Sequence, residues 1–520
     1  MIRVQDLFHA LARKQVVGIM PKVMMSFTKA KSDSTSYFQL NHSTLDSSDL
    51  LSADADNPIQ LWDTYKYADY SDRLTSVEYS RSIEYPYNVQ TALADISLDN
   101  SDDMFSPISE SELAPYNLPS RPVKLYMSYD GATDNVGQFV GITQGMPQLD
   151  GNSKTVKYHA MDFLSSIAEQ NLTKVVNLRD CTTDVVLAKI VEQFGVLPSQ
   201  YEFEKGANNI PFVFFDENAN AGDAIRKLMQ AEGGKFWLDE AGILRFTART
   251  HMTGDAQYEF ANHQILSIEP SGESGIVNHV HIVCDVRDVQ EFQTIYTKDS
   301  SGNSTSTNLW VVPPMGSYTI SVSLDDPCAS IVTPTQGLNS GVSWFTTKRS
   351  NGVVVNTGVT ATGELHESSY EITFTSTLNY SVEVDEMSLW GEPAKVVDQI
   401  VYDAYDDESV EKYGDQKLEI TDNQFFQDYD QVRSFGIWTL SSYANYNPSI
   451  TMSVRGDFSL QLGDVIKIGY GDYAGTYQID SMSYRISNGQ FSNTIVAHKH
   501  KPVTYFTLNK SRLNGSDLLA

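Results

Sequence analysis

A run of acidic residues near position 100 has almost the spacing of a calcium-binding loop. Asp99, Ser101 and Asp103 fall at positions one, three and five of the EF-hand template. Glu110 falls at position twelve, but Met104 occupies the position where the loop needs glycine for its sharp turn. Strands rather than helices are also expected on both sides. We therefore interpret the run as a polar hairpin turn and assign no metal to it.

Histidine and cysteine supply a second group of candidate ligands. His279, His281 and Cys284 are close in sequence, yet on a strand the two histidines share one face and Cys284 lies on the other. Such a set cannot converge on zinc without a bulge. His498 and His500 could pair in the same way, but no carboxylate or thiol accompanies them. We interpret all five as ordinary strand residues.

The familiar catalytic motifs are missing from the sequence. It contains no Gly-x-Ser-x-Gly, His-Glu-x-x-His, Gly-x-Gly-x-x-Gly or phosphate-loop lysine motif. The acidic run 54–57 lacks the glycine and the glutamate of a calcium loop. Trp62, Tyr65, Tyr67 and Tyr70 could stack on sugars, but aromatic residues at this spacing more often pack or form interfaces. We therefore predict no catalytic residue, no cofactor-binding residue and no metal ligand.

Period-two alternation of apolar residues dominates the chain and predicts β-strands. It is clearest at 92–98 and 123–127, and acidic or Asp-Gly turns separate these runs. Short strands at hairpin spacing predict a closed or nearly closed antiparallel barrel over 21–165. Similar strands return at 265–288, and at 452–486 after a short polar helix near 428–444. The chain is therefore predicted to be mainly β.

Helical spacing appears in three places in the middle block. Leu164, Ile167 and Ala168 form one stripe, and a second helix has Thr183 as its N-cap and Gly195 as its stop. A third runs from 220–223 to the glycines at 233–234, and a hairpin around 239–242 follows. This block is predicted to be a small α+β domain. The Ser/Thr/Asn/Gly stretch 298–308 is interpreted as a linker or an exposed loop.

These patterns together predict a mainly β chain with an α+β part. Two β-rich blocks bracket the small α+β domain, and about 85 residues at 309–394 suit an independent β-sandwich. The predicted segments are an N-terminal helix (1–20), a first barrel (21–165), the α+β domain (166–250), a second β-rich block with an accessory helix region (251–308 and 395–505), the sandwich (309–394) and a C-terminal tail (506–520).

Length and charge exclude several classes of protein. The 520 residues are too many for one core, and 37 basic against 66 acidic residues give a net charge of −29. That balance argues against a reader of duplex DNA and against docking on anionic lipid. Three cysteines cannot build a disulfide framework, no apolar run is long enough for a membrane span, and the start lacks the apolar block of a secretory signal.

Several segments, taken together, resemble the tail hub (baseplate hub) proteins of bacteriophages. The first runs from Leu93-Ala-Asp-Ile-Ser-Leu-Asp-Asn through Phe105-Ser-Pro, and Arg121-Pro-Val then opens a strand. The other segments that carry the resemblance are Phe139-Val-Gly-Ile, Val156-Lys-Tyr-His-Ala-Met-Asp, Ala231-Glu-Gly-Gly, Trp237-Leu-Asp-Glu-Ala-Gly-Ile-Leu-Arg-Phe, Leu460-Gln-Leu-Gly-Asp-Val-Ile, Tyr477-Gln-Ile and Tyr484-Arg-Ile.

The resemblance implies a structural protein of the virion at the tail tip or baseplate. It also implies two antiparallel barrel domains that flank the small α+β domain, with the sandwich 309–394 inserted in the second barrel (251–308 and 395–505). In that family three copies place six similar barrels in a ring, which closes the six-fold tail tube and forms part of the DNA ejection channel. The implied partners are two further copies of the chain, the distal tail or tail tube ring, the end of the tape measure protein, a central fibre or spike, and DNA only in transit. A host-surface glycan bound through 309–394 is a further candidate partner, suggested by the sandwich and by its aromatic residues rather than by the resemblance. No appended peptidase, lysozyme or long fibre region is recognisable.

Charge fits a role beside a DNA channel, because an acidic lumen does not retain a polyanion. Three chains at −29 each give −87, so some carboxylates are expected to line or rim the bore. Two other functions remain open: a carbohydrate-binding surface or adhesion protein, and a cell-wall hydrolase. An enzymatic function is not predicted, because the sequence contains no persuasive active site.

Overall fold

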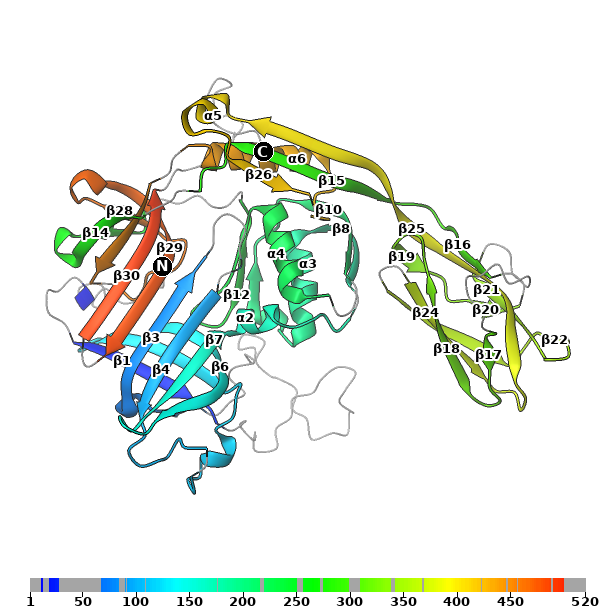
Figure 1. Ribbon diagram of the computed structural model, residues 1–520, viewed down its shortest axis with the longest axis horizontal. Helices are drawn as coiled ribbons and strands as arrows, with labels where there is room; N and C mark the ends of the chain where they lie inside the picture. Colours follow the sequence, from blue (N-terminus) through cyan, green and yellow to red (C-terminus); the bar gives the residue numbers. More distant parts are fainter. Residues whose placement is uncertain are drawn as a thin grey trace.

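The computed structural model shows a β-rich molecule in three parts: a large curled sheet, a compact α+β part and an elongated β insert (Figure 1). No helix among the described residues is long and apolar enough to cross a membrane. The structure describes residues 11–12, 18–27, 67–83, 89, 91–107, 109–174, 176–215, 219–249, 256–271, 275–298, 309–337, 342–366, 369–421, 423–445, 448–455, 457–487 and 490–499.

Seven strands from the first part of the chain form one end of the large sheet. They are β1 (Ile19–Met25), β2 (Ala68–Asp69), β3 (Leu74–Ser82), β4 (Thr91–Asp99), β5 (Pro122–Tyr129), β6 (Val136–Asp150) and β7 (Thr155–Asp162). They are antiparallel throughout, in the order β3-β4-β7-β6-β5-β1-β2. The alternation predicted at 92–98 is confirmed, because Ala92, Ala94, Ile96 and Leu98 are all buried on one face.

Six strands from later in the chain extend the same sheet. They are β13 (Tyr258–Phe260), β14 (Ile265–Ser271), β27 (Ser449–Val454), β28 (Val465–Ile468), β29 (Gly475–Ser487) and β30 (Gln490–Lys499). Their order is β14-β27-β30-β29, with β28 and β13 attached beside the first half of β29. The second half of β29 pairs with β3, so the two sets of strands are joined edge to edge.

One hydrophobic core fills the inner face of this thirteen-stranded sheet. It contains residues from both sets of strands, for example Ile96 and Met127 from the first and Met452 and Ile495 from the second. The sheet curls around this core, and among the described strands its pairing path ends at β14 and β2 without closing (Figure 1). Strands from both of the predicted barrels therefore lie in one sheet and share one core.

The middle of the chain forms the α+β part with a second core. Its elements are α2 (Phe163–Ala168), β8 (Val176–Thr182), α3 (Thr183–Val191), β9 (Tyr201–Phe203), β10 (Asn209–Phe215), α4 (Ala221–Glu232), β11 (Lys235–Leu238) and β12 (Leu244–Thr247). Asn220 caps α4 and Gly233 ends it in the left-handed region, as predicted. The N-cap of α3 is Thr182 rather than Thr183, and Gly195 follows its last turn.

A layer of later elements covers the α+β core. It consists of β15 (His279–Val289), β26 (Lys417–Ile420), α5 (Asp407–Tyr413), α6 (Tyr429–Tyr443) and the second half of β25 (Val382–Tyr405). The helix predicted near 428–444 is present, but it is not a polar helix, because Val432, Phe435 and Trp438 are buried against the core. Asp428 caps it.

This layer differs from the predicted domain organisation. The sequence placed 251–308 and 395–505 together in a second barrel, but β15 and the end of β25 pack on the α+β core instead. Alternation put Val280 and Ile282 correctly on one face of a strand. Alternation shows that a strand has one buried face, but it does not show which core that face covers. For this reason β15 and the end of β25 were assigned to the wrong core.

The insert is a sandwich of two sheets around a third core. One sheet has β16 (Gln293–Lys298), β17 (Val311–Val312), β19 (Cys328–Ile331), β20 (Thr335–Gln336), β21 (Trp344–Lys348), β22 (Val354–Val355) and the first half of β25. The other has β18 (Ser317–Ser323), β23 (Val359–Leu365) and β24 (Ser369–Ser376). Phe374 of the second sheet meets Phe345 of the first edge to face, with ring centroids 4.9 Å apart. The predicted 309–394 lies inside this unit, which also includes β16.

Some predicted segments fall outside the described residues. Within the predicted N-terminal helix 1–20, Leu11 and Ala12 are helical and buried, Ile19 and Met20 belong to strand β1 instead, and residues 1–10 and 13–17 lie outside the described residues. Also outside are the acidic run 54–57, Trp62 and Tyr65, the loop 299–308, His500 and the tail 506–520.

Candidate assembly surfaces

The acidic run after β4 is a turn whose groups bond to neighbouring protein groups. Arg73 donates two hydrogen bonds to the carboxylate of Asp102, at 2.9 and 2.7 Å, and holds the pKa of that carboxyl below its usual range. Asp99 accepts from the backbone and the hydroxyl of Ser101. Asp103 adopts a left-handed backbone with φ of 57°, which lets the chain turn back toward Phe105.

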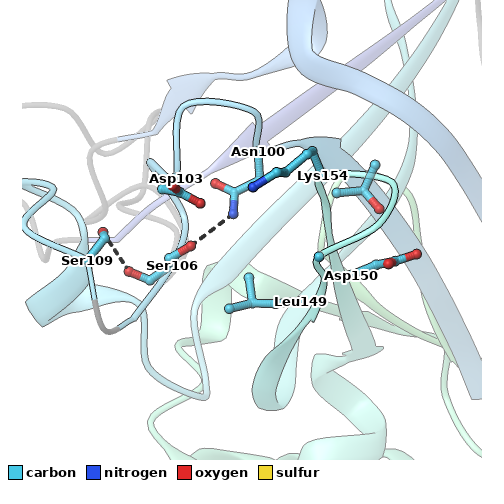
Figure 2. A pocket seen from close by; sticks show the side chains of 9 residues that line it. Asn100, Asp103, Ser106, Ser109, Leu149, Asp150 and Lys154 are labelled. Carbon is cyan, nitrogen blue, oxygen red and sulfur yellow. Dashed lines mark hydrogen bonds between the residues drawn. The ribbon is translucent and has the colours of Figure 1, made fainter.

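A pocket of about 340 Å³ lies between this turn and the β6–β7 hairpin (Figure 2). Asn100 spans its wall: the side-chain amide donates to Ser106 Oγ at 3.1 Å and the backbone N–H donates to the carbonyl of Lys154 at 2.8 Å. Asp150 accepts hydrogen bonds from the hairpin residue Ser153. These polar groups hold the two turns together. Within the described part of the chain, no group of three or more His, Cys, Asp or Glu is arranged to hold a metal.

The histidines of β15 lie on one face, as predicted, and Cys284 is buried on the other. His279 Nε2 lies 2.7 Å from Asp403 on β25, and His279 Nδ1 lies 2.9 Å from Asp415 before β26. A neutral imidazole has one N–H, so both contacts are favourable only for the imidazolium. The two hydrogen-bonded carboxylates accordingly raise the pKa of His279, against a smaller opposing effect of burial.

The contacts of His279 with Asp403 and Asp415, called the histidine bridge below, predict that the stability of the fold depends on pH. Because the pKa of His279 is raised in the fold, its contribution is complete below the ordinary histidine pKa of about 6.5 and is lost as pH rises through the folded value. We expect the unfolding free energy to decrease by about 0.5–1 kcal/mol as pH rises through the folded-state pKa of His279. Urea titrations from pH 5 to 9 measure it, and His279→Gln should flatten the profile. An unchanged slope in the variant would show that His279 is not the titrating group.

A buried ion pair lies at the joint, the place where β3 and β29 pair and connect the two sets of strands. Arg81 of β3 donates to Glu240, in the turn between β11 and β12, and both side chains are 6% exposed or less. Gln461, in the turn before β28, donates to the other oxygen of Glu240. Burial is the largest single effect on the pKa of Arg81 and lowers it, but the charge and hydrogen bond of Glu240 together with the neighbouring Tyr79 and Tyr484 outweigh burial, so the pKa is raised. One carboxylate therefore links both sets of strands to the α+β part.

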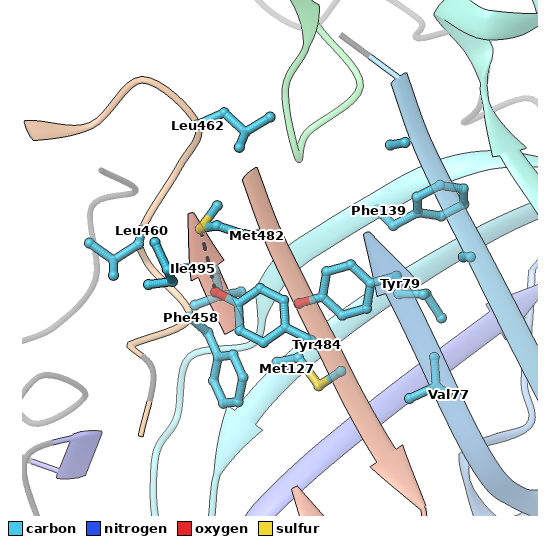
Figure 3. Close-up of a cluster of buried hydrophobic side chains, with 14 of the residues drawn as sticks. Val77, Tyr79, Met127, Phe139, Phe458, Leu460, Leu462, Met482, Tyr484 and Ile495 are labelled. Carbon is cyan, nitrogen blue, oxygen red and sulfur yellow. Dashed lines mark hydrogen bonds between the residues drawn. The ribbon is translucent and has the colours of Figure 1, made fainter. Parts of the chain in front are cut away.

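Aromatic stacking continues the joint into the core (Figure 3). Tyr79 of β3 stacks on its register partner Tyr484 of β29, with ring centroids 4.8 Å apart. The Tyr79 hydroxyl donates to Gln138 at 2.7 Å, and Gln138 donates to the carbonyl of Phe458 at 2.8 Å. Both polar groups of this buried chain are satisfied, so the stack stabilises the joint without an unpaired hydroxyl.

The two ends of the joined sheet present unpaired strand edges within the described chain. β14 pairs only with β27, and the short β2 pairs only with β1. Leu266 of β14 is 56% exposed and Met20 at the start of β1 is equally so. Unpaired backbone groups beside exposed apolar side chains are the ordinary requirements for strand addition by another chain.

Aromatic side chains of the insert are mostly engaged in its own core. Trp310, Tyr370 and Phe374 are buried, and Arg349 lies over the ring of Tyr380 at 3.6 Å. In the Tyr-rich stretch 62–70, for which packing was favoured over sugar stacking, Tyr70 is buried against Phe27 and Phe105. The exposed outer face of the β18-β24-β23 sheet instead carries hydroxyl groups in rows, such as the Ser317–Thr375 pair at 2.9 Å.

Sequence reasoning did not find the Arg81–Glu240–Gln461 group. Its members are 159 and 221 residues apart, so no local spacing relates them. The sequence did contain one signal. Val77, Tyr79 and Arg81 alternate on the inward face of β3, and an unpaired charge on that face would be costly. The histidine bridge was considered only as a metal site, and its carboxylate partners were missed.

Comparisons with known proteins give matches among solved structures. No protein-family model matches the sequence, and no curated protein matches it. Three solved tail proteins match most of the chain. The 43 kDa tail protein of prophage MuSo2 from Shewanella oneidensis has 9% identity, covers 83% of this chain and 94% of its own, and has a TM-score of 0.42. A tail protein from Neisseria meningitidis MC58 has 8% identity, coverages of 84% and 94% and a TM-score of 0.44, and a prophage tail protein from Listeria monocytogenes EGD-e has 11% identity, coverages of 84% and 92% and a TM-score of 0.41.

Proposed function

We propose that this chain is a structural protein of a phage tail, a hub at the tail tip or baseplate that works as a homotrimer. The observation that carries the proposal is the joint between β3 and β29. One chain already joins two sets of strands edge to edge, and the strands at the two ends of the pairing path, β14 and β2, each have an unpaired edge in the described chain. Repeating the same kind of edge contact between chains turns a curled sheet into a ring.

Three chains would bring six sets of strands around the axis, which matches a six-fold tail tube on one side and a three-fold fibre or spike on the other. A closed ring would pair the edges of β14 and β2 that are open in the single chain. The proposed neighbours are the distal tail or tail tube ring, the end of the tape measure protein and the central fibre or spike. The site of action is the virion, and no enzymatic step is proposed.

The charge supports passage of DNA through such a ring. At −29 per chain, the assembly carries a strongly acidic surface that repels the phosphate backbone. DNA is then a polyanion in transit rather than a bound ligand. A structure of the assembly with a neutral or basic bore would contradict this part of the proposal.

The edge model predicts the effect of a charge at β14. Leu266→Asp puts a carboxylate beside the unpaired edge, and we expect trimer association to weaken by at least about tenfold, because a desolvated charge opposes strand pairing. The fold should change by less than about 0.5 kcal/mol, since Leu266 is exposed. Analytical ultracentrifugation measures the association. Leu197→Asp, at an exposed leucine of the α+β part, serves as the control.

Glycan binding through the insert is a separate proposal for a further partner. The hydroxyl rows on the outer face of the β18-β24-β23 sheet favour it, since sugars accept and donate hydrogen bonds to such groups. The buried aromatic residues argue against sugar stacking. A glycan array probed with the full chain tests the proposal, and a silent array would remove this partner while leaving the hub proposal untouched. Zymography on purified cell wall tests the hydrolase alternative.

A further inference from the structure

The base of the insert covers an apolar patch on the α+β part. The patch consists of Phe212 and Phe214 on one face of β10, and they pack against Ala394 of β25 and neighbouring residues of the insert. Phe212 is 2% exposed and Phe214 7%. Their neighbours in sequence, Val213 and Phe215, point into the α+β core instead. The burial of this phenylalanine pair therefore depends on where the insert lies.

Polar contacts hold the insert in that position. They come from β8, the pairing partner of β10: Asn177 Nδ2 donates to the carbonyls of Cys328 and Ala329 at 3.0 and 2.9 Å. Arg179 forms a two-pronged ion pair with Glu392 of β25, and Ser330 Oγ donates to the same carboxylate at 2.6 Å. The Arg179 guanidinium lowers the pKa of Glu392, so this carboxyl is ionised at neutral pH. We call Asn177, Arg179 and Glu392 the latch.

The latch lies next to an irregular stretch of the two strands that carry the insert. β25 passes unbroken from the α+β layer into the insert, but its partner is interrupted at residues 290–292 between β15 and β16. Register shifts lie on both sides, between Val286 and Arg287 and between Thr294 and Tyr296. Bulges bend a strand pair and weaken its ladder locally. This stretch is therefore the natural bending point of the connection.

We propose that the insert is a hinged arm: it bends about residues 290–292 and the facing part of β25, and the latch holds it closed over Phe212 and Phe214. The arm hangs on two strands, and its contact with the α+β part is a small apolar patch with a few polar bonds. Contacts of that kind between domains allow relative motion. Opening leaves the sandwich core around Phe374 intact and brings the phenylalanine pair of β10 into water.

Charge reversal in the full chain tests the latch. Glu392→Arg places two cations together, Arg179→Glu places two carboxylates together, and the double variant restores an opposite-charge pair. Hydroxyl-radical footprinting with mass spectrometry reports the accessibility of individual phenylalanine side chains. We expect labelling of Phe212 and Phe214 to rise roughly five- to tenfold in each single variant, and to return to within about twofold of the natural chain in the double variant.

Matched controls separate hinge motion from unfolding. Glu202→Arg reverses an exposed partner of Arg245 in the same α+β part, away from the insert, and should leave labelling unchanged. Trp310 and Phe374 report on the sandwich core and should stay protected in all variants. Unchanged labelling of the phenylalanine pair in both single variants would overturn the proposal. So would a parallel rise at Trp310, because the insert would then be losing its fold rather than swinging.

Discussion

Arg81→Ala is expected to destabilise the large sheet by about 3–5 kcal/mol. The change removes the cation and leaves the Glu240 carboxylate buried at the joint with its charge uncompensated. It also releases the point at which β3, the β11–β12 turn and the turn before β28 meet. Urea unfolding followed by circular dichroism measures the loss, and hydrogen exchange in β3 and β29 should accelerate along with it.

A neighbouring arginine provides the control. Arg485 on β29 pairs with Glu78 across the same joint, at 3.7 Å, but its side chain is 64% exposed. Arg485→Ala should therefore cost less than about 0.5 kcal/mol. Replacing both buried partners, as Arg81→Met with Glu240→Leu, should recover much of the loss, because no unpaired charge remains. Equal effects of Arg81→Ala and Arg485→Ala would show that the buried pair does not organise the joint.

Phe374→Ala is expected to unfold the insert while the remainder of the chain stays folded. Phe374 is fully buried between Phe345 and Trp310, and truncation of such a ring costs about 3–5 kcal/mol. That cost approaches the lower limit, about 5 kcal/mol, of the unfolding free energy of a whole domain. Hydrogen exchange should show loss of protection in β18, β21 and β24, with β3 and β29 unchanged.

The control for the insert is Val353→Ala, an exposed position in the same sandwich, which should leave its exchange unchanged. If Phe374→Ala also removed protection from β3 and β29, the insert and the large sheet would be one cooperative unit. The division of the molecule into three cores would then be incorrect in energetic terms.

Local elements could be predicted from the sequence because their signals are local. The side chain of Asn220 caps the start of α4, and Gly233 ends the helix in the left-handed region. Both residues act within one turn of the helix. The hairpin of β11 and β12 follows from the Asp239 to Gly242 turn, where Asp239 accepts the backbone N–H groups of Ala241 and Ile243. The alternation at 92–98 fixes which face of β4 is buried.

Contacts between distant strands could not be predicted in the same way. Tyr484 pairs with Tyr79 across some 400 residues, and alternation shows only that each strand has an apolar face. The same limit explains why β15 was placed in a barrel although Val280 covers the α+β core. The histidine bridge depends on Asp403 and Asp415, which no spacing connects to His279.

The central claim is that the open, edge-joined sheet of one chain closes into a ring in a trimer. Averaged electron micrographs of the purified protein, with its mass measured by light scattering, test it most directly. The claim predicts a particle of about 174 kDa from three chains of 58.0 kDa, with three-fold symmetry and a central hole. A monodisperse 58.0 kDa particle, or an assembly that leaves β14 and β2 unpaired, would contradict it.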